Sequence, residues 1–434
     1  MAMGLTLHQM ENLYLLSKEK AFATVFPGEV FEEKKLGYTL SFLHQAVRKW
    51  LAYKELESNE GEFQVLLVRA LRKRNLKRHV ASEVTATRKL LEQDTRRDHQ
   101  YLDCLDRLQA EVYEQELLQS RHAGTLFGSW AEATTQHFVA VKLRQSCTAL
   151  AHRALLKVEF QADLTEEVLE FAARHECFGQ PAIRVYFALY HVLANRDAGQ
   201  YYPEVRIFLS RSAGVFSKVE CRDLYLLLIN YNIRQVNDSE ETIRREHHLR
   251  EVLELYQQGL DKDVFIDQGV LSPFTYNNIA MAALGLQRWE WAARFLETYR
   301  EKLSDAARDN AYSYNLALLH FRQGHYDQAM RLLSPTDFTD LHHALSARRM
   351  LLRCYYELGE WTALDALLDS FFNFLHRNKS IGYHRQHYLN LVRLTRKLLQ
   401  LTPGDAAKRA AVRREAEATK FLAEREWLLS KLVF

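Results

Sequence analysis

Histidines near the end of the chain are the residues whose types and spacing come closest to a metal site. His384 and His387 lie three residues apart in the segment GYHRQHY, so they can share one face of a helix. His376 precedes them, and His342 and His343 lie further upstream. A zinc site needs three or four ligands, and this segment offers no carboxylate or thiolate beside the pair. We therefore expect surface or hydrogen-bonded histidines and no bound metal.

Nucleophilic catalysis has even less support in the sequence. Cys177 follows His175 by two residues, but side chains at that spacing do not face each other on a helix, and no third group would orient them. The chain contains no Walker A loop, no G-x-G-x-x-G, no H-E-x-x-H, no G-x-S-x-G and no pair of C-x-x-C motifs. Its 5 cysteines are scattered singly, which is typical of reduced, buried thiols in a cytosolic protein. We expect no enzymatic activity and no cofactor.

Positive charge is concentrated in one short run, RALRKRNLKRH at residues 69–79. Its arginines and lysines could neutralise several phosphates of a nucleic acid. Acidic residues between positions 55 and 62 flank the run, however, and the run has no aromatic residues on which bases could stack. A solvated helix face is therefore the favoured interpretation, and an anionic partner is the alternative.

The strongest pattern is structural and lies in the second half of the chain. In residues 314–333, apolar residues recur at three- and four-residue steps on both sides of Gly324. This spacing predicts two short helices joined by a reversal at the glycine, which takes a positive φ at little cost. Similar units lie on either side, and the aromatic residue that opens each second helix falls at Trp289, Tyr326 and Trp361. These steps of 37 and 35 residues indicate a repeated helix pair.

Residues 272–379 resemble three consecutive tetratricopeptide repeats. The residues that match the family's small, glycine and aromatic positions are Ala280, Trp289 and Ala292 in the first unit and Ala317, Gly324, Tyr326 and Ala329 in the second. In the first unit Gly285 lies four residues before the aromatic instead of two. The third unit has Leu352 and Leu364 where the family prefers small residues, which predicts a wider spacing of its helices.

Composition agrees with an all-α fold. The chain has only 6 prolines and 16 glycines among 434 residues, and no segment alternates between apolar and polar residues as a strand would. We predict an α-α superhelix, a right-handed solenoid of tetratricopeptide-like antiparallel helix pairs, with longer helices in the N-terminal half. No uncharged apolar run reaches about 18 residues, so no membrane insertion is expected. The N-terminus also lacks the pattern of a secretory signal, and we predict a cytoplasmic location.

The predicted organisation has four parts. They are an N-terminal helical region at 1–178, either a degenerate solenoid or a bundle, helical hairpins that continue the solenoid at 179–271, the repeats at 272–379, and C-terminal helices at 380–434. Within the first part, a long amphipathic helix is predicted by apolar residues that alternate steps of three and four, namely Leu36, Leu40, Leu43, Val47 and Trp50. Near the end, we expect one uninterrupted capping helix from Thr402 to Leu432, whose apolar second half covers the last hydrophobic surface.

The resemblance also implies where a partner would bind. First helices of a tetratricopeptide array line a concave surface, which binds a peptide or helix of a partner protein. The positions that face this groove in the family fall on Asn277, Met281, Tyr314, Leu318, Phe321, Arg349, Arg353 and Tyr356. Arg349 and Arg353 lie one turn apart, which suggests an acidic patch on the partner.

Another repeat family offers an alternative. Pentatricopeptide repeats have nearly the same period and read single-stranded RNA one base per repeat. The segment FTYNNIAMAALG, with Asn277 and Asn278, is similar to the opening of such repeats, but the other two units do not repeat it. We therefore predict a non-enzymatic scaffold for protein–protein interaction. The alternatives are a helical-repeat protein that binds nucleic acid, RNA in particular, and an adaptor that works by self-association. The whole chain resembles bacterial proteins with a helical front half and a tetratricopeptide-like back half.

Overall fold

The chain folds into two compact units of α-helices. The computed structural model describes residues 17–118, 124–156, 163–175, 179–195, 198–211, 214–334, 341–378, 381–382, 384–402 and 405–433. The described parts of Met1–Ser146 and Ala162–Phe187 form the first unit, and those of Cys147–Gln161 and Ala188–Phe434 form the second. Two helices contribute to both units, α7 (Gly124–Leu156) and α9 (Pro181–Leu193). The boundaries predicted at 178/179, 271/272 and 379/380 stay predictions.

The first unit is built around three helices that pack on one another, α4 (Glu60–Lys73), α5 (Lys77–Gln93) and α6 (His99–Leu117). Their apolar stripes bury a small core that consists of Val65, Val68, Val80, Leu91, Cys104 and Leu108. The unit also contains α2 (Lys18–Val25), α3 (Glu33–Ser58) and α8 (Thr165–Arg174). Helix α3 confirms the predicted long amphipathic helix, although the apolar face that predicted it is exposed beyond Leu36.

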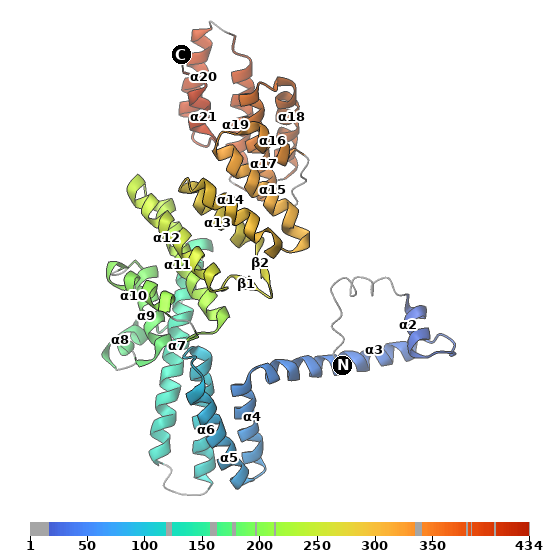
Figure 1. The fold of residues 1–434 in the computed structure, drawn as a ribbon, viewed down its shortest axis with the longest axis vertical. Helices are drawn as coiled ribbons and strands as arrows, with labels where there is room; N and C mark the ends of the chain where they lie inside the picture. The colour runs from blue at the N-terminus through green and yellow to red at the C-terminus, as the bar shows by residue number, and fades with distance from the viewer. Residues whose placement is uncertain are drawn as a thin grey trace. The chain divides into compact units, whose positions relative to one another are not determined.

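The second unit is a run of helix pairs. Its helices after α9 are α10 (Ala198–Arg211), α11 (Lys218–Asp238), α12 (Thr242–Asp261), α13 (Pro273–Gly285), α14 (Trp289–Tyr299), α15 (Asp305–Arg322), α16 (Tyr326–Leu333), α17 (Leu341–Leu358), α18 (Trp361–Arg377), α19 (His384–Leu399), α20 (Ala406–Ala418) and α21 (Arg425–Ser430), with a 3-10 turn, η2, at Arg300–Lys302. Each helix from α10 to α19 packs on the next, and α15 also packs on both α13 and α17 (Figure 1). The pairs thus stack as an α-helical repeat solenoid, and the predicted fold class is confirmed.

The predicted starts of the second helices are also correct. Trp289, Tyr326 and Trp361 are the first residues of α14, α16 and α18. Three residues further on, Ala292 and Ala329 are fully buried, and their helices pack on the preceding ones, as the small residue of each predicted second helix requires.

Turn geometry explains why the first repeat departs from the family pattern. Gly324 and Gly359 have φ of +81° and +72°, and each lies two residues before its aromatic. In the first pair this position is Gln287, which adopts φ of +57° although it is not glycine. Gly285 serves a different purpose, since a Cβ there would lie 2.7 Å from Cδ2 of Leu249 on α12. The missing side chain lets α13 approach α12 closely.

The sequence predicted no strand, and the structure corrects this at one place. The strands β1 (Ile266–Asp267) and β2 (Val270–Leu271) pair antiparallel just before α13. Gln268 and Gly269 between them both have positive φ, which is the geometry of a tight two-residue hairpin turn. Two-residue strands are too short to show the alternation by which a strand is predicted.

The prediction of one uninterrupted helix from Thr402 to Leu432 is wrong. The segment forms α20 and α21, which are separated by residues 419–424. The helical path breaks at Thr419, which has an extended ψ of 107°, and Glu424, with a left-handed φ of 54° and ψ of 33°, precedes α21. The apolar side chains beyond the break still join one buried cluster with α17, α18 and α19, as Leu422, Trp427, Leu428 and Leu432.

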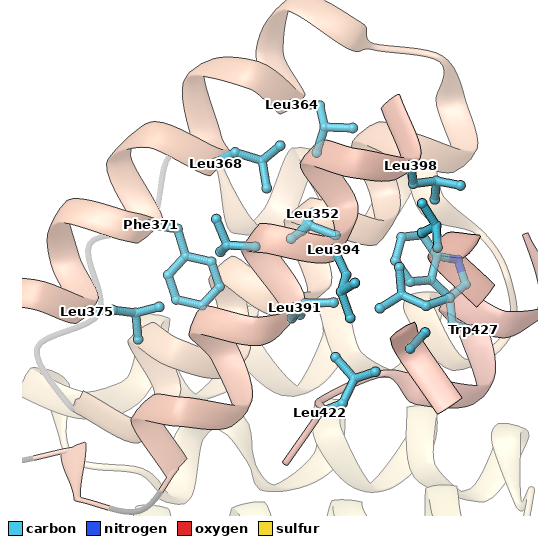
Figure 2. Packing of buried hydrophobic residues seen from close by; sticks show 14 of the residues in the cluster. Leu352, Leu364, Leu368, Phe371, Leu375, Leu391, Leu394, Leu398, Leu422 and Trp427 are labelled. Carbon is cyan, nitrogen blue, oxygen red and sulfur yellow. The ribbon is translucent and has the colours of Figure 1, made fainter. Parts of the chain in front are cut away.

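Figure 2 shows how this cluster closes the last repeat. Helix α18 contributes four side chains spaced four, three and four residues apart, Leu364, Leu368, Phe371 and Leu375. They face Leu352 of α17 and a second row on α19, formed by Leu391, Leu394 and Leu398. Leu352 and Leu364, the two large residues at positions where the family prefers small ones, are both fully buried.

Two substitutions test the role of the left-handed turn residues. Gly324→Ala should lower the free energy of unfolding by about 1 kcal/mol, because alanine is strained at φ of +81° although nothing lies within 4 Å of the added Cβ. Gln287→Gly should leave stability unchanged or raise it by up to ~1 kcal/mol, because it removes that strain. Urea unfolding of both variants is the measurement, and changes of the same sign and size would contradict this account.

Candidate partner-binding surface

The eight predicted groove residues lie on three first helices of the solenoid. Asn277 and Met281 lie on α13, Tyr314, Leu318 and Phe321 on α15, and Arg349, Arg353 and Tyr356 on α17. The structure brings together the last part of α15 and the middle of α17. We call the surface formed by Phe321, Arg349, Arg353, Tyr356 and Glu357 the clamp face.

The two arginines of the clamp face bind one carboxylate of their own chain. Arg349 donates to Oε1 of Glu424, and Nη1 of Arg353 lies 2.7 Å from Oε2 of the same residue. Burial alone would raise the pKa of Glu424, but the two guanidinium groups offset this and hold the pKa below its ordinary value. Glu424 is therefore a carboxylate at neutral pH. It lies more than 70 positions after the arginines in the sequence.

Aromatic rings surround this ion pair. The guanidinium carbon of Arg353 lies 4.8 Å from the ring centroid of Phe321 and 5.6 Å from that of Trp427. Arg349 lies 5.9 Å from the Phe321 ring. Planar arginine side chains stack well on such rings, so the Phe321 ring stabilises both cations.

A second polar contact holds the same C-terminal segment. Nε1 of Trp427 donates to Glu357 at 2.7 Å, and Nζ of Lys431 lies 2.8 Å from the other oxygen of that carboxylate. Burial would raise the pKa of Glu357, but hydrogen bonds from Lys431 and Trp427 hold it below its ordinary value. The Tyr356 ring meets the Trp427 ring edge-on, with centroids 5.2 Å apart. Residues 424–431 thus cover the clamp face.

Sequence reasoning missed three contributors to this site, Glu357, Glu424 and Trp427. Glu357 directly follows a predicted groove residue, so its position could have been inferred from α17 alone. Glu424 and Trp427 could not, because they belong to a segment that was predicted to continue as a straight helix.

Positive charge exceeds negative charge around Glu424. Partial burial, and then repulsion from Arg349, lower the pKa of Arg322 at the end of α15, while Glu424 raises it. Three guanidinium groups therefore lie near one carboxylate. This excess would favour a ligand that carries more than one negative charge.

The other predicted groove residues do not form part of the clamp face. Leu318 is 1 % exposed, and Tyr314 is buried, where its hydroxyl donates to Oγ of Ser346 at 3.0 Å and its ring stacks on His343. Met281 on α13 is 44 % exposed and Asn277 is half-buried. The two buried residues support the helix packing, while α13 presents its pair separately from the arginines.

The histidines and cysteines of the chain are scattered in the part that the structure describes. Within the described residues, no group of three or more histidine, cysteine, aspartate or glutamate side chains could hold a metal ion. The side chains of His342 and His384 and all of Cys177 lie outside that part of the chain. Burial raises the pKa of Cys104 to about 11 and that of Cys354 to about 12, so both remain thiols at neutral pH.

The basic run at residues 69–79 is partly neutralised by a carboxylate of the neighbouring helix α6. Nε of Arg69 lies 2.5 Å and Nε of Arg72 lies 2.7 Å from the two oxygens of Glu111, a buried residue of α6. These contacts bind α4 to α6. Two of the cations that an RNA or DNA backbone would need are therefore already paired, which weakens the nucleic-acid alternative.

One family comparison matches the clamp face and its neighbours. A family model described as anaphase-promoting complex, cyclosome, subunit 3 matches residues 287–370, from the turn residue Gln287 before α14 to the middle of α18. These repeats are tetratricopeptide-like. Repeats of this kind generally mediate interactions between proteins. This match covers about a fifth of the chain. No curated protein and no solved structure matches the chain.

No helix in the described ranges combines the length and the apolar composition that a membrane span requires.

The second unit should lose stability when the carboxylate of Glu424 is removed. Glu424→Gln should lower the free energy of unfolding by about 2 kcal/mol at pH 7, because it leaves two half-buried arginines with a weaker partner. Since the pKa of Glu424 is depressed in the folded state, the native carboxylate stabilises above its ordinary pKa and this contribution is lost as the pH falls. The difference between the two chains should therefore shrink below pH ~4. Chemical unfolding at several pH values measures it.

Glu426→Gln is the matched control, because Glu426 is exposed in the same segment. It should change stability by less than ~0.5 kcal/mol. Equal effects of the two substitutions at pH 7 would refute the clamp.

Glu111 should be as important to the first unit. Glu111→Ala leaves Arg69 and Arg72 without their buried carboxylate and should cost about 3 kcal/mol. Glu114→Ala is the control, since Glu114 is exposed and lies 3.6 Å from Arg72. Thermal unfolding of both variants is the measurement, and a harmless Glu111→Ala would disprove the role of this ion pair.

Proposed function

We propose that this chain is a non-enzymatic scaffold whose tetratricopeptide-like repeats bind an acidic segment of a partner protein at the clamp face. The observation that carries the proposal is the capture of the Glu424 carboxylate by Arg349 and Arg353. These arginines are one turn apart on a first helix, where repeats of this kind bind their ligands. The clamp face thus has the chemistry to bind a carboxylate that is followed closely by an aromatic side chain.

The C-terminal segment is the intramolecular counterpart of that partner. It places Glu424 between the arginines and Trp427 against Tyr356 and Glu357, so it satisfies both polar parts of the clamp face. A partner with the same chemistry would replace this segment. Because Glu424 is tethered, its effective concentration is high, and the partner needs extra charge or area to compete. The surplus guanidinium of Arg322 offers a place for a second acidic group.

The family comparison agrees with a role in protein assembly. The matching model takes its name from a subunit of a complex, the anaphase-promoting complex. A groove for a partner's peptide or helix is the usual use of a solenoid whose first helices lie side by side. A cytoplasmic location is part of the proposal, because Cys104 and Cys354 are buried thiols and form no disulfide in the described part of the chain.

Affinity purification from the cell of origin tests the proposal. Glu424→Gln frees the arginines and should raise recovery of the partner about tenfold, because the competing segment is weakened. Arg353→Glu should reduce recovery at least tenfold, since it repels an acidic ligand. Mass spectrometry of the recovered proteins is the measurement.

Arg331→Glu on α16 is the control, because Arg331 is exposed and lies in the same repeat region as the clamp face. It should leave recovery unchanged. Phe321→Ala is unsuitable, because Phe321 is 6 % exposed and its loss would create a cavity. Partners that are recovered equally by the native chain, by Glu424→Gln and by Arg353→Glu would exclude this face as the binding site.

A further inference from the structure

Helix α3 is the least protected helix of the first unit. It is 26 residues long, and its one buried residue is Leu36. Every residue from Leu40 to Glu55 is exposed. An isolated helix is marginally stable in water, and helices in proteins depend on packing of an apolar face. Helix α3 therefore lacks the contacts that such a helix normally has.

The neighbours of α3 lie at its ends. It packs on α2, which precedes it, and on α4, which follows it. Figure 1 shows α3 extending from α4 with no other described helix of the first unit beside its central turns. The open part is therefore the middle of the helix, from Leu40 to Tyr53.

The open part carries a regular apolar stripe. Leu36, Leu40, Leu43, Val47 and Trp50 alternate steps of four and three, which is the a and d spacing of a coiled coil. The last four of these side chains are 42 % to 56 % exposed. We call this stripe the α3 seam. The flanking e and g positions carry no charge, and they are occupied by Gly37, Thr39, His44, Ala46, Leu51 and Tyr53.

We propose that the α3 seam pairs antiparallel with the α3 seam of a second copy of this chain. In this arrangement Leu40 of one copy packs on Trp50 of the other, and Leu43 packs on Val47. The two-fold axis passes beside Gln45, and Ala46 of each copy flanks it, where its small side chain allows close approach. Each large residue is thus opposite a smaller one, and the uncharged flanks add no repulsion.

Self-complementarity is the reason to choose a second copy as the occupant. The four layers Leu40–Trp50, Leu43–Val47, Val47–Leu43 and Trp50–Leu40 read the same in both directions, as an isologous two-fold interface requires. A parallel pair would instead place Trp50 against Trp50 in one layer, which is overpacked. The uncharged e and g positions also carry no code for choosing a different helix.

The area agrees with a dimer interface. The exposed parts of Leu40, Leu43, Val47, Trp50, Leu51 and Tyr53 amount to on the order of 500 Å² of apolar side chain per copy. That is as large as the largest patch on a typical monomer. With the polar atoms that flank it, the seam approaches the ~800 Å² per partner of a standard stable interface.

Light scattering of the full chain after size exclusion tests the proposal. At roughly 50 μM the native chain should have twice the 50.8 kDa mass of one copy. Leu43→Glu should halve this mass, because it buries a charge in the seam. Phe42→Glu is the matched control, since Phe42 is the neighbouring residue, is 75 % exposed and lies outside the seam. It should leave the mass unchanged.

A native chain that is monomeric at this concentration overturns the proposal, as does a dimer that survives Leu43→Glu. A monomer that becomes dimeric only when residues 2–16 are deleted also overturns it, because the seam would then be covered by its own chain. A monomer that sediments with anionic lipid vesicles would assign the seam to a membrane surface.

Spin labels at Lys54→Cys distinguish the two directions, with the labelled native chain as the control for its own cysteines. The antiparallel pair separates the two labels by about 27 Å along the helix axis. A separation near 10 Å means parallel helices and overturns the proposed arrangement.

Discussion

Each helix pair of the second unit depends on its neighbours to bury the apolar side chains that it cannot bury alone. Ala292 and Ala329 are fully buried because they are small enough for adjacent helices to meet over them. Gly285 serves the same requirement between α13 and α12, where even a Cβ would be too close to Leu249. A solenoid built this way always leaves one apolar face at its end. In this chain α19 and the segment beyond Thr419 cover that face, with Trp427 in the last buried cluster.

Both units use the same polar device to fix one helix against a distant segment. In the first unit, Arg69 and Arg72 bind Glu111 of α6. In the second, Arg349 and Arg353 bind Glu424. In each case two arginines about one turn apart on one helix share a carboxylate that is almost removed from water. A single buried pair gains little over an apolar contact, but two guanidinium groups satisfy both oxygens and compensate the carboxylate for its lost hydration. Such a contact specifies one arrangement of the segments.

The repeat geometry could be predicted from the sequence because it is set by local residues. Trp289, Tyr326 and Trp361 mark helix starts, and Gly324 marks a turn, whatever lies elsewhere in the chain. The clamp face could be predicted only in part. The resemblance to tetratricopeptide repeats implies Arg349 and Arg353 as groove residues, whereas their ligand Glu424 depends on a break in a segment of high helix propensity. That break has no local signal, because a left-handed glutamate is strained on its own and is stabilised here by contacts with α17.

The same contrast separates the two exposed features of the chain. An amphipathic stripe predicts a helix, but it does not say what the stripe packs against. On α18 the stripe of Leu364, Leu368, Phe371 and Leu375 is buried by α17 and α19. On α3 an equally regular stripe is buried only at Leu36, and its side chains from Leu40 to Trp50 are exposed in the described part of the chain. The clamp face already has an occupant within the chain, since residues 424–431 bind its arginines and Glu357. Among the described helices of the first unit, none covers the α3 seam from Leu40 to Trp50. Under the two proposals the surfaces differ in kind, since a ligand of the clamp face would have to displace residues 424–431, whereas a second copy would pack directly on the exposed α3 stripe.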